Sequence, residues 1–123
     1  MVQGDTFEVK RVFTNADVER FVEMSGDRNH QHVTPDEKGR VVVHGLLTAT
    51  MPSIIGGELS VNAREFRIEW FKPVYTGDEL VCKITVDKLE HRPSRMKITA
   101  LFEIFNQLEE RVASGHFFGL IAV

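Results

Sequence analysis

The chain has 123 residues, of which 42% are hydrophobic and 27% are charged, and its formal net charge is -3. This length suits one domain with a single hydrophobic core, and the ordinary composition excludes a disordered chain. The slight negative charge and the lack of a long basic run exclude a nucleic-acid-binding surface as the main function. No apolar stretch is long enough to span a bilayer, and Cys82 is the only cysteine. We expect one domain, residues 1–123, in the reducing cytoplasm.

The first third of the chain predicts a strand, a helix and a polar loop. The β-prone run 7–13 precedes Thr14 and Asp17, whose spacing is a variant of the helix-capping box. Apolar residues at helical spacing follow, and Gly26 can take the left-handed conformation that ends a helix. We therefore expect a helix from about Thr14 to Gly26, followed by a loop over residues 27–40 that carries polar candidates for chemistry.

Residues 45–56 predict a buried helix, because their apolar side chains leave almost no polar face. Pro52 cannot donate a hydrogen bond to the carbonyl of Thr48, so a kink or an early end is expected near it.

The second half of the chain predicts an antiparallel sheet. Apolar residues alternate with polar ones around residues 66–70, 80–87 and 96–104, and residues 110–123 supply a last strand. Turns are expected at residues 75–78 and 91–94. A helix that is apolar all round, followed by such a sheet, predicts an α+β fold in which the sheet wraps around a central helix.

Three motifs in order carry a family resemblance. They are SGDRNHQH at residues 25–32, VHGLL at 43–47 and FKPVYTGD at 71–78. They resemble the MaoC-like branch of the hot-dog fold, the (R)-specific enoyl-CoA hydratases and 3-hydroxyacyl-thioester dehydratases. That branch carries patterns close to S-G-D-x-N-P-x-H, an H-G-hydrophobic helix start and F-x-x-P-V-x-x-G-D. Here His30 replaces the family's proline, and the stretch between His32 and His44 is shorter than usual.

The resemblance implies a hot-dog domain, a homodimer whose sheets join edge to edge, and an acyl thioester of coenzyme A or an acyl-carrier protein as substrate. It implies neither a cofactor nor a metal. The predicted reaction is the reversible hydration of a trans-2-enoyl thioester to the (R)-3-hydroxyacyl thioester. Such a reaction needs a base to activate water at Cβ, an acid to protonate Cα and donors for the enolate oxygen.

Asp27 and His32 are the predicted acid/base pair, because the loop can bring a carboxylate and an imidazole to one water. The alternative is that Asp27 caps a turn and His32 is a solvated loop residue. Asn29 is expected to support the loop by hydrogen bonds to backbone, and Ser25 belongs to the same motif. A metal site formed by His30, His32 and His44 is not expected, since no acidic or thiolate ligand accompanies them at a familiar spacing.

Gly45 is the predicted oxyanion donor, because a helix start exposes free N–H groups and glycine lets a carbonyl approach closely. The alternative is that Gly45 only permits helix packing, and the two roles are compatible. Leu46 and Leu47 are predicted to line an acyl pocket that suits short chains. Arg92 and Arg95 are candidates for binding the carrier's phosphates, with a solvated charged turn as the alternative.

Three other functions remain open on the sequence. The first is a hot-dog thioesterase, in which the carboxylate would activate water against the carbonyl. The second is a non-catalytic thioester-binding module or subunit. The third is a dehydratase subunit that needs a second, different chain.

Overall fold

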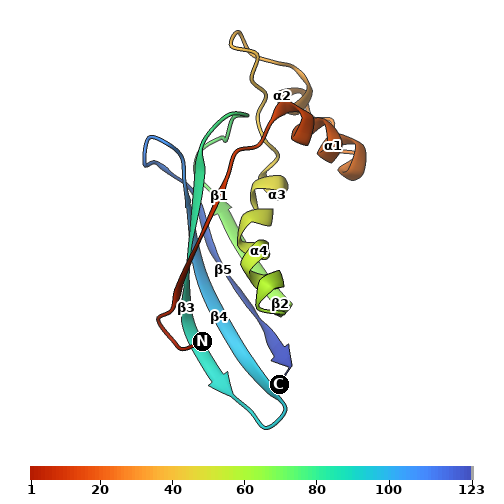
Figure 1. Cartoon of the computed structure of the whole chain (residues 1–123). Helices are drawn as coiled ribbons and strands as arrows, with labels where there is room; N and C mark the ends of the chain where they lie inside the picture. Colours follow the sequence, from red (N-terminus) through yellow and green to blue (C-terminus); the bar gives the residue numbers. More distant parts are fainter. Residues whose placement is uncertain (123) are drawn as a thin grey trace.

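A computed structural model of the chain describes residues 1–122 and contains one antiparallel sheet with helices on one side (Figure 1). The strands are β1 (Thr6–Arg11), β2 (Asn62–Trp70), β3 (Leu80–His91), β4 (Arg95–Phe105) and β5 (Arg111–Ala122). The helices are α1 (Asn15–Ser25), α2 (His30–Val33), α3 (Gly45–Thr48) and α4 (Thr50–Glu58). The predicted order of elements is confirmed, and the last residue of the predicted final strand, Val123, lies outside the described residues.

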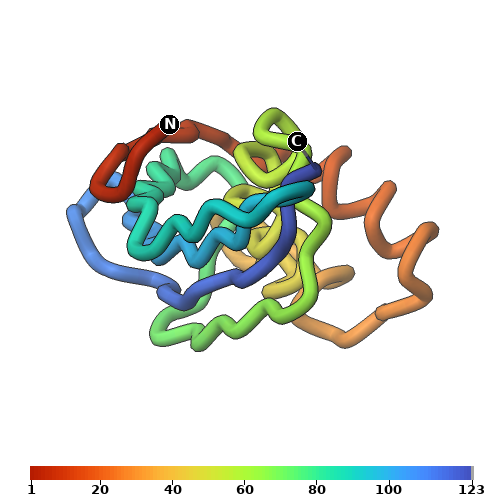
Figure 2. The backbone as a smooth tube through the Cα atoms, turned by 90° about the horizontal axis from the view of Figure 1, so that it is seen from below, coloured from red at the N-terminus to blue at the C-terminus, as the bar shows by residue number. Residues whose placement is uncertain are grey.

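The sheet has five strands in the order β1-β3-β4-β5-β2, and every neighbouring pair is antiparallel. It curves around α3 and α4, which Figure 2 shows in yellow inside the bend of the blue and cyan strands. Alternate residues of β3, β4 and β5 point into the core, where the apolar side chains of Ile84, Phe102 and Phe117 are buried. This is the predicted α+β arrangement of a sheet around a helix.

Helix α1 begins and ends where the sequence predicts. The Thr14 hydroxyl accepts a hydrogen bond from the N–H of Asp17 at 3.2 Å, and an Asp17 carboxylate oxygen accepts from the N–H of Thr14 at 2.9 Å. This is the reciprocal capping box. Gly26 closes the helix with φ 76°, and its N–H donates to the carbonyl of Val22. The residues after Gly26 therefore leave the helix in a defined direction.

The helical segment after Gly45 is divided, as Pro52 predicts. α3 ends at Thr48 and α4 begins at Thr50. The break therefore comes just after Thr48, whose carbonyl receives no hydrogen bond from Pro52 because proline has no N–H. The prediction of a fully buried helix is wrong for the chain by itself. Met51 is completely buried, but Leu46 is 67% exposed, because the sheet covers only one side of the helix.

The polar loop also differs from its prediction. Residues 27–40 contain one helical turn, α2, which places His32 inside the protein while His30 stays exposed. The Asn29 side chain caps this turn by accepting from the N–H of Gln31 at 3.3 Å.

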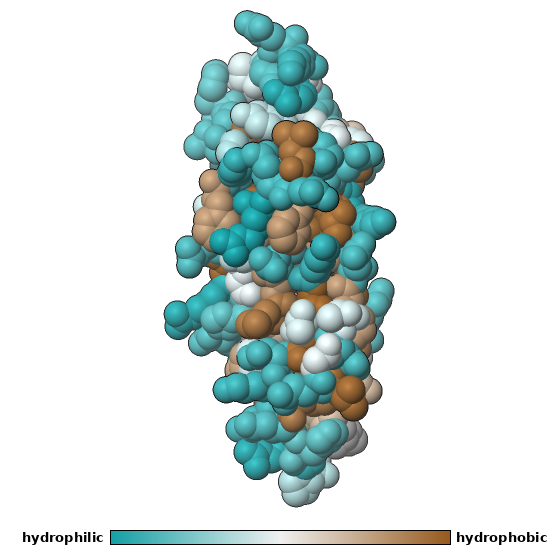
Figure 3. Space-filling view, turned by 90° about the vertical axis from the view of Figure 1, so that its left-hand side faces the viewer, coloured by the Kyte–Doolittle hydropathy of each residue, from teal (hydrophilic) through white to brown (hydrophobic). Residues whose placement is uncertain are grey.

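Cys82 lies in the core, where burial raises the pKa of its thiol to about 12. The thiol is therefore protonated at neutral pH, in agreement with its interpretation as a small hydrophobic residue. The face drawn in Figure 3 is mostly hydrophilic, with hydrophobic residues gathered near its middle. Within residues 1–122, no helix has the length and apolar character needed to cross a membrane.

Candidate active site

Asp27 is held by a chain of short-range hydrogen bonds. The Ser25 hydroxyl accepts from the N–H of Asp27 at 3.1 Å, and one carboxylate oxygen of Asp27, Oδ1, accepts from the N–H of Asn29 at 3.1 Å. Asp27 thus caps the turn, as the structural alternative predicts. Its other oxygen, Oδ2, is free to face His32, and about half of the side chain is exposed. A turn-capping role and a chemical role are therefore compatible.

His32 is buried and oriented by the backbone. Its Nδ1–H donates to the carbonyl of Val42 at 2.6 Å, which leaves Nε2 as the free ring nitrogen. Nε2 lies 3.9 Å from Oδ2 of Asp27. This separation is too long for a direct hydrogen bond, and it is short enough for one water to contact both atoms at about 2.8 Å. The prediction that the loop folds Asp27 and His32 together agrees with this geometry.

His44 joins the pair from the start of α3. Its Nε2–H donates to the backbone carbonyl of Asp27 at 3.0 Å, and its ring stacks on His32 with 3.7 Å between the ring centroids. The edge of Phe21 packs against the same ring. His44 is almost fully buried and fixes both catalytic candidates, one by its hydrogen bond and the other by stacking.

Gly45 opens α3 next to this pair. None of the described residues accepts a hydrogen bond from the N–H of Gly45, as expected for the first turn of a helix. The indole ring of Trp70, at the end of β2, covers this glycine. A Cβ atom on Gly45 would lie 2.8 Å from the ring, and the indole N–H donates to the Gly45 carbonyl at 3.1 Å.

Two pockets meet at Gly45 and Trp70. One has a volume of about 330 Å³ and is lined by Asp27, His44 and Leu46 as well as by the two shared residues. The other, of about 390 Å³, is lined by His32, Thr48 and the segment from Phe71 to Val74. Asp27 and His32 therefore open onto different pockets, and Gly45 and Trp70 form the boundary between them.

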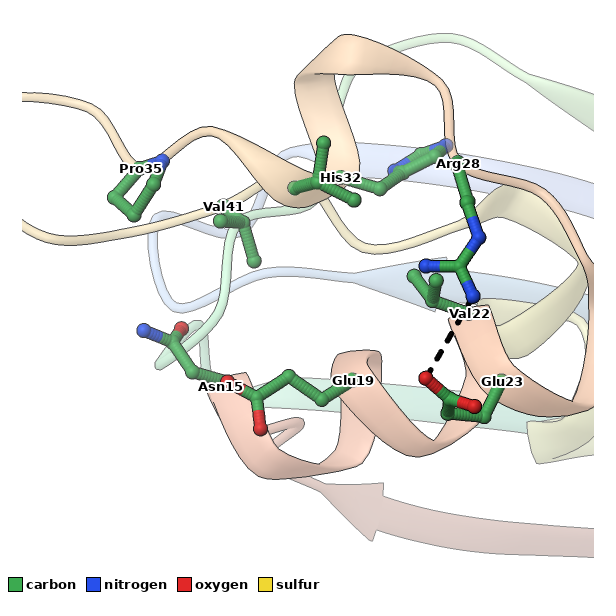
Figure 4. A pocket seen from close by; sticks show the side chains of 9 residues that line it. Asn15, Glu19, Val22, Glu23, Arg28, His32, Pro35 and Val41 are labelled. Carbon is green, nitrogen blue, oxygen red and sulfur yellow. Dashed lines mark ion pairs between the residues drawn. The ribbon is translucent and has the colours of Figure 1, made fainter.

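A third hollow lies on another side of His32, between α1 and the loop (Figure 4). Glu19 and Glu23 of α1 line it, and Arg28 forms an ion pair with Glu23 at 3.6 Å. The apolar residues Val22, Val33, Pro35 and Val41 line it together with these charged ones, and it contains neither Asp27 nor Gly45. The two pockets that meet at Gly45 are therefore the better candidates for the site.

The structure does not bring all of the predicted site residues together. Leu46 lines the pocket beside Asp27, whereas Leu47 is half-buried and packs against the hydrophobic core. Arg92 and Arg95 lie in the hairpin between β3 and β4, where the N–H of Arg92 donates to the carbonyl of Arg95. This hairpin is at the opposite end of the molecule from α2 (Figure 1). Within one chain, Arg92 and Arg95 are therefore remote from Asp27 and His32.

Proteins with related sequences and folds include hydratases and dehydratases. The mitochondrial 3-hydroxyacyl-acyl-carrier-protein dehydratase of Arabidopsis thaliana is 28% identical over 115 residues, which cover 85% of this chain and 69% of that protein. The (R)-hydratase of A. caviae is 25% identical with a TM-score of 0.83, and the match covers 96% of this chain and 95% of that one. The unliganded R-hydratase of Pseudomonas aeruginosa is 21% identical with a TM-score of 0.84, and the match covers 99% of this chain and 82% of that one. No protein-family model matches the chain.

The chain has the hot-dog fold of the R-hydratases. Its predicted resemblance to this group is confirmed, and so is the predicted enzyme class, a hydratase or dehydratase.

The replacement of the family's proline by His30 has a structural explanation. His30 is the first residue of α2, the helix position that proline fills best. In this hot-dog domain, Asn29 caps the turn, and a bond between His30 Nδ1 and the Thr34 hydroxyl at 3.2 Å adds to it. The turn is therefore formed without proline, and His32 is still delivered to the interior.

Trp70 is the site residue that sequence reasoning missed, because it was read only as part of the alternation of a strand. One signal could have found it. The family pattern F-x-x-P-V places an aromatic residue three positions before the proline, and Trp70 stands three positions before Pro73.

A metal ion would have three possible ligands here. Asp27, His32 and His44 each offer one ligand atom, and these atoms lie within 4.8 Å of one another. His30, which the sequence grouped with His32 and His44, is not part of this cluster. Two ring nitrogens of the cluster already bind backbone carbonyls, so the arrangement is also that of an acid/base site with oriented histidines.

Proposed function

We propose that this protein catalyses the reversible hydration of a trans-2-enoyl thioester to the (R)-3-hydroxyacyl thioester. The observation that carries the proposal is the placement of His32 Nε2 at 3.9 Å from Asp27 Oδ2, with the other ring nitrogen bound to Val42. A neutral imidazole whose Nδ1 carries the proton has a lone pair on Nε2. That lone pair can accept a proton from a water that the Asp27 carboxylate also holds.

In the proposed addition, the water oxygen forms a bond with Cβ as His32 takes one of its protons. The electrons of the double bond move toward the thioester carbonyl, whose oxygen becomes negative. The free N–H of Gly45, at the start of α3, supports the proposal that this oxygen is stabilised there. The acid/base pair then delivers a proton to Cα, and the net result is one water added across the double bond. Dehydration follows the same steps in reverse.

The surroundings supply support for the pair. The Ser25 hydroxyl accepts from the N–H of Asp27, and the backbone N–H of Asn29 donates to the Asp27 carboxylate. His44 connects the Asp27 carbonyl to the His32 ring. We assign Ser25, Asn29 and His44 positioning roles, because each holds a reacting group without an atom of its own facing the proposed water. Rigid support of this kind keeps reacting groups within the narrow range of productive geometry.

We propose that the active form is a homodimer that joins at β2. Both edge strands carry charged side chains, such as Lys10 on β1 and Arg67 on β2, but the exposed aromatic residues Phe66, Trp70 and Phe71 lie at or next to β2. Exposed apolar surface along an edge invites pairing. A second chain at β2 would also cover the exposed side of α3. Light scattering coupled to size-exclusion chromatography tests this proposal, and a monomer at micromolar concentration would contradict it.

Purified protein with crotonyl-CoA tests the reaction. Hydration removes the absorbance of the conjugated enoyl thioester without releasing a thiol. A thioesterase would instead release free coenzyme A, which a thiol reagent detects. A binding module would do neither, and a dehydratase subunit that needs a different chain would be inactive alone. We expect hydration, unchanged by a chelator, with both coenzyme A and acyl-carrier-protein thioesters as candidates for the natural substrate.

A further inference from the structure

We infer that Trp70 determines which acyl chains the site accepts, an inference that rests on the proposed hydration. Trp70 and Gly45 are the residues common to the two pockets that contain Asp27 and His32. A thioester that reacts between Asp27 and His32 with its carbonyl at Gly45 must therefore pass along the indole ring. One part of the substrate enters each pocket, and the ring fixes how much room each part has.

The chemistry of the walls indicates which part goes where. Apart from Ser25, Asp27 and His44, the pocket beside Asp27 is bounded by Phe21, Leu46 and the ring of Trp70, which are apolar and suit an acyl tail. The pocket beside His32 has polar groups at Gln31 and Lys72, which suit the amides and phosphates of the carrier arm. Lys72 is paired with Glu110, so a phosphate would compete with this carboxylate for the ammonium group.

Trp70 also acts on the oxyanion donor. Its indole N–H donates to the Gly45 carbonyl, and its ring packs where a Cβ atom of residue 45 would lie. Both contacts hold the first turn of α3 in place from outside the helix. Phenylalanine would keep a ring at this place but has no N–H to donate. Trp70 therefore has two roles that substitution can separate: its ring lines the pockets, and its N–H holds the Gly45 carbonyl.

The experiment compares Trp70→Ala, Trp70→Phe and a control, Leu101→Ala, on enoyl-CoA substrates with four and eight carbons. Leu101 lies on β4, which is not next to β2, is exposed to a similar degree (43% against 46%) and lines neither pocket. We expect Trp70→Ala to raise the ratio of kcat/KM for eight carbons over four carbons by roughly tenfold or more, because the indole ring no longer limits the room for the acyl chain. Trp70→Phe should keep the wild-type ratio and lower kcat, with little change in KM. Leu101→Ala should keep both the wild-type ratio and the wild-type kcat.

A second readout needs no turnover. Trp70 is the only tryptophan in the chain, so its fluorescence reports on the site directly. Saturated butyryl-CoA should change the emission saturably and bind more tightly than octanoyl-CoA. If the protein binds in this way but hydrates nothing, the proposed reaction fails and the role of Trp70 in chain selection stands. An unchanged emission with butyryl-CoA, or a chain-length profile of folded Trp70→Ala equal to that of the wild type, would overturn the inference.

Discussion

The two ends of the molecule hold their polar side chains in different ways. At the α2 end, His32 and His44 are buried, stacked on each other and hydrogen-bonded to backbone carbonyls. At the β3–β4 hairpin, Arg92 is half exposed and pairs with Glu90 two residues away. Buried, oriented groups can do chemistry because water does not compete for their bonds, whereas exposed ion pairs contribute little. The comparison therefore favours the α2 end as the location of the proposed chemistry.

The largest expected effect comes from Asp27 and His32. Asp27→Asn and His32→Ala should each lower kcat by about 10²- to 10⁴-fold, the range for a positioned acid/base group. Because both side chains are proposed to act on one water, the double variant should be little worse than either single variant. Steady-state kinetics of the three variants measures this.

The matched control for these variants is His30→Ala. His30 belongs to the same turn, but it is exposed, and its side chain hydrogen-bonds to the Thr34 hydroxyl. Its loss should leave kcat close to wild type. If His30→Ala is as damaging as His32→Ala, the α2 end matters as a whole and the assignment to particular atoms is wrong.

Gly45→Ala should have the next largest effect. The added Cβ would lie 2.8 Å from the Trp70 ring, so either the ring or the first turn of α3 must move. We expect at least a tenfold loss of kcat/KM, or about 1.4 kcal/mol, because the loss of an oxyanion donor costs about 10²- to 10³-fold. Gly56→Ala, in α4, is the control, because nothing lies within 4 Å of its Cβ position and its φ is ordinary. Equal activity of both variants would remove Gly45 from the site.

Thr14→Ala should affect stability more than chemistry. It removes the hydroxyl half of the capping box of α1, which costs about 1 kcal/mol. The Thr14 backbone N–H, which the variant keeps, holds the pKa of the Asp17 carboxyl below its usual value. The stability that comes from this low pKa is present above the unfolded-state pKa of Asp17 and is lost as the pH falls through the folded-state pKa. Urea unfolding at neutral pH should show the loss of stability in Thr14→Ala, and the loss in Asp17→Ala, which removes the carboxylate itself, should shrink between neutral pH and about pH 3.

The smallest effect is expected at the other end of the molecule. The sequence suggested that Arg92 and Arg95 bind the carrier's phosphates, which would raise KM in the double variant Arg92→Ala/Arg95→Ala. Since the hairpin lies far from α2 in the same chain, we expect no change in kcat or KM. A KM raised severalfold for a coenzyme A thioester would mean that the hairpin of a neighbouring copy reaches the site.

The sequence predicted those parts of the site that local bonds determine. Asp27 and Asn29 are positioned by contacts within a few residues, so a short motif contains most of their geometry. The ring of His32 is oriented by residues further along the chain, Val42 and His44. Trp70 was missed because its contact with Gly45 spans 25 positions and depends on how β2 meets α3. The exposure of Leu46 was missed for a related reason. An apolar pattern indicates that a face becomes covered, but it does not say whether the same chain covers it.

The most direct test of the account is the stereochemistry of water addition to crotonyl-CoA by the wild-type protein and by Asp27→Asn. The account predicts that the wild type forms (R)-3-hydroxybutyryl-CoA without releasing free thiol, and that Asp27→Asn loses at least about a hundredfold in kcat while keeping the wild-type melting temperature. Release of free coenzyme A by the wild type, formation of the (S) product, or full activity of Asp27→Asn would contradict it.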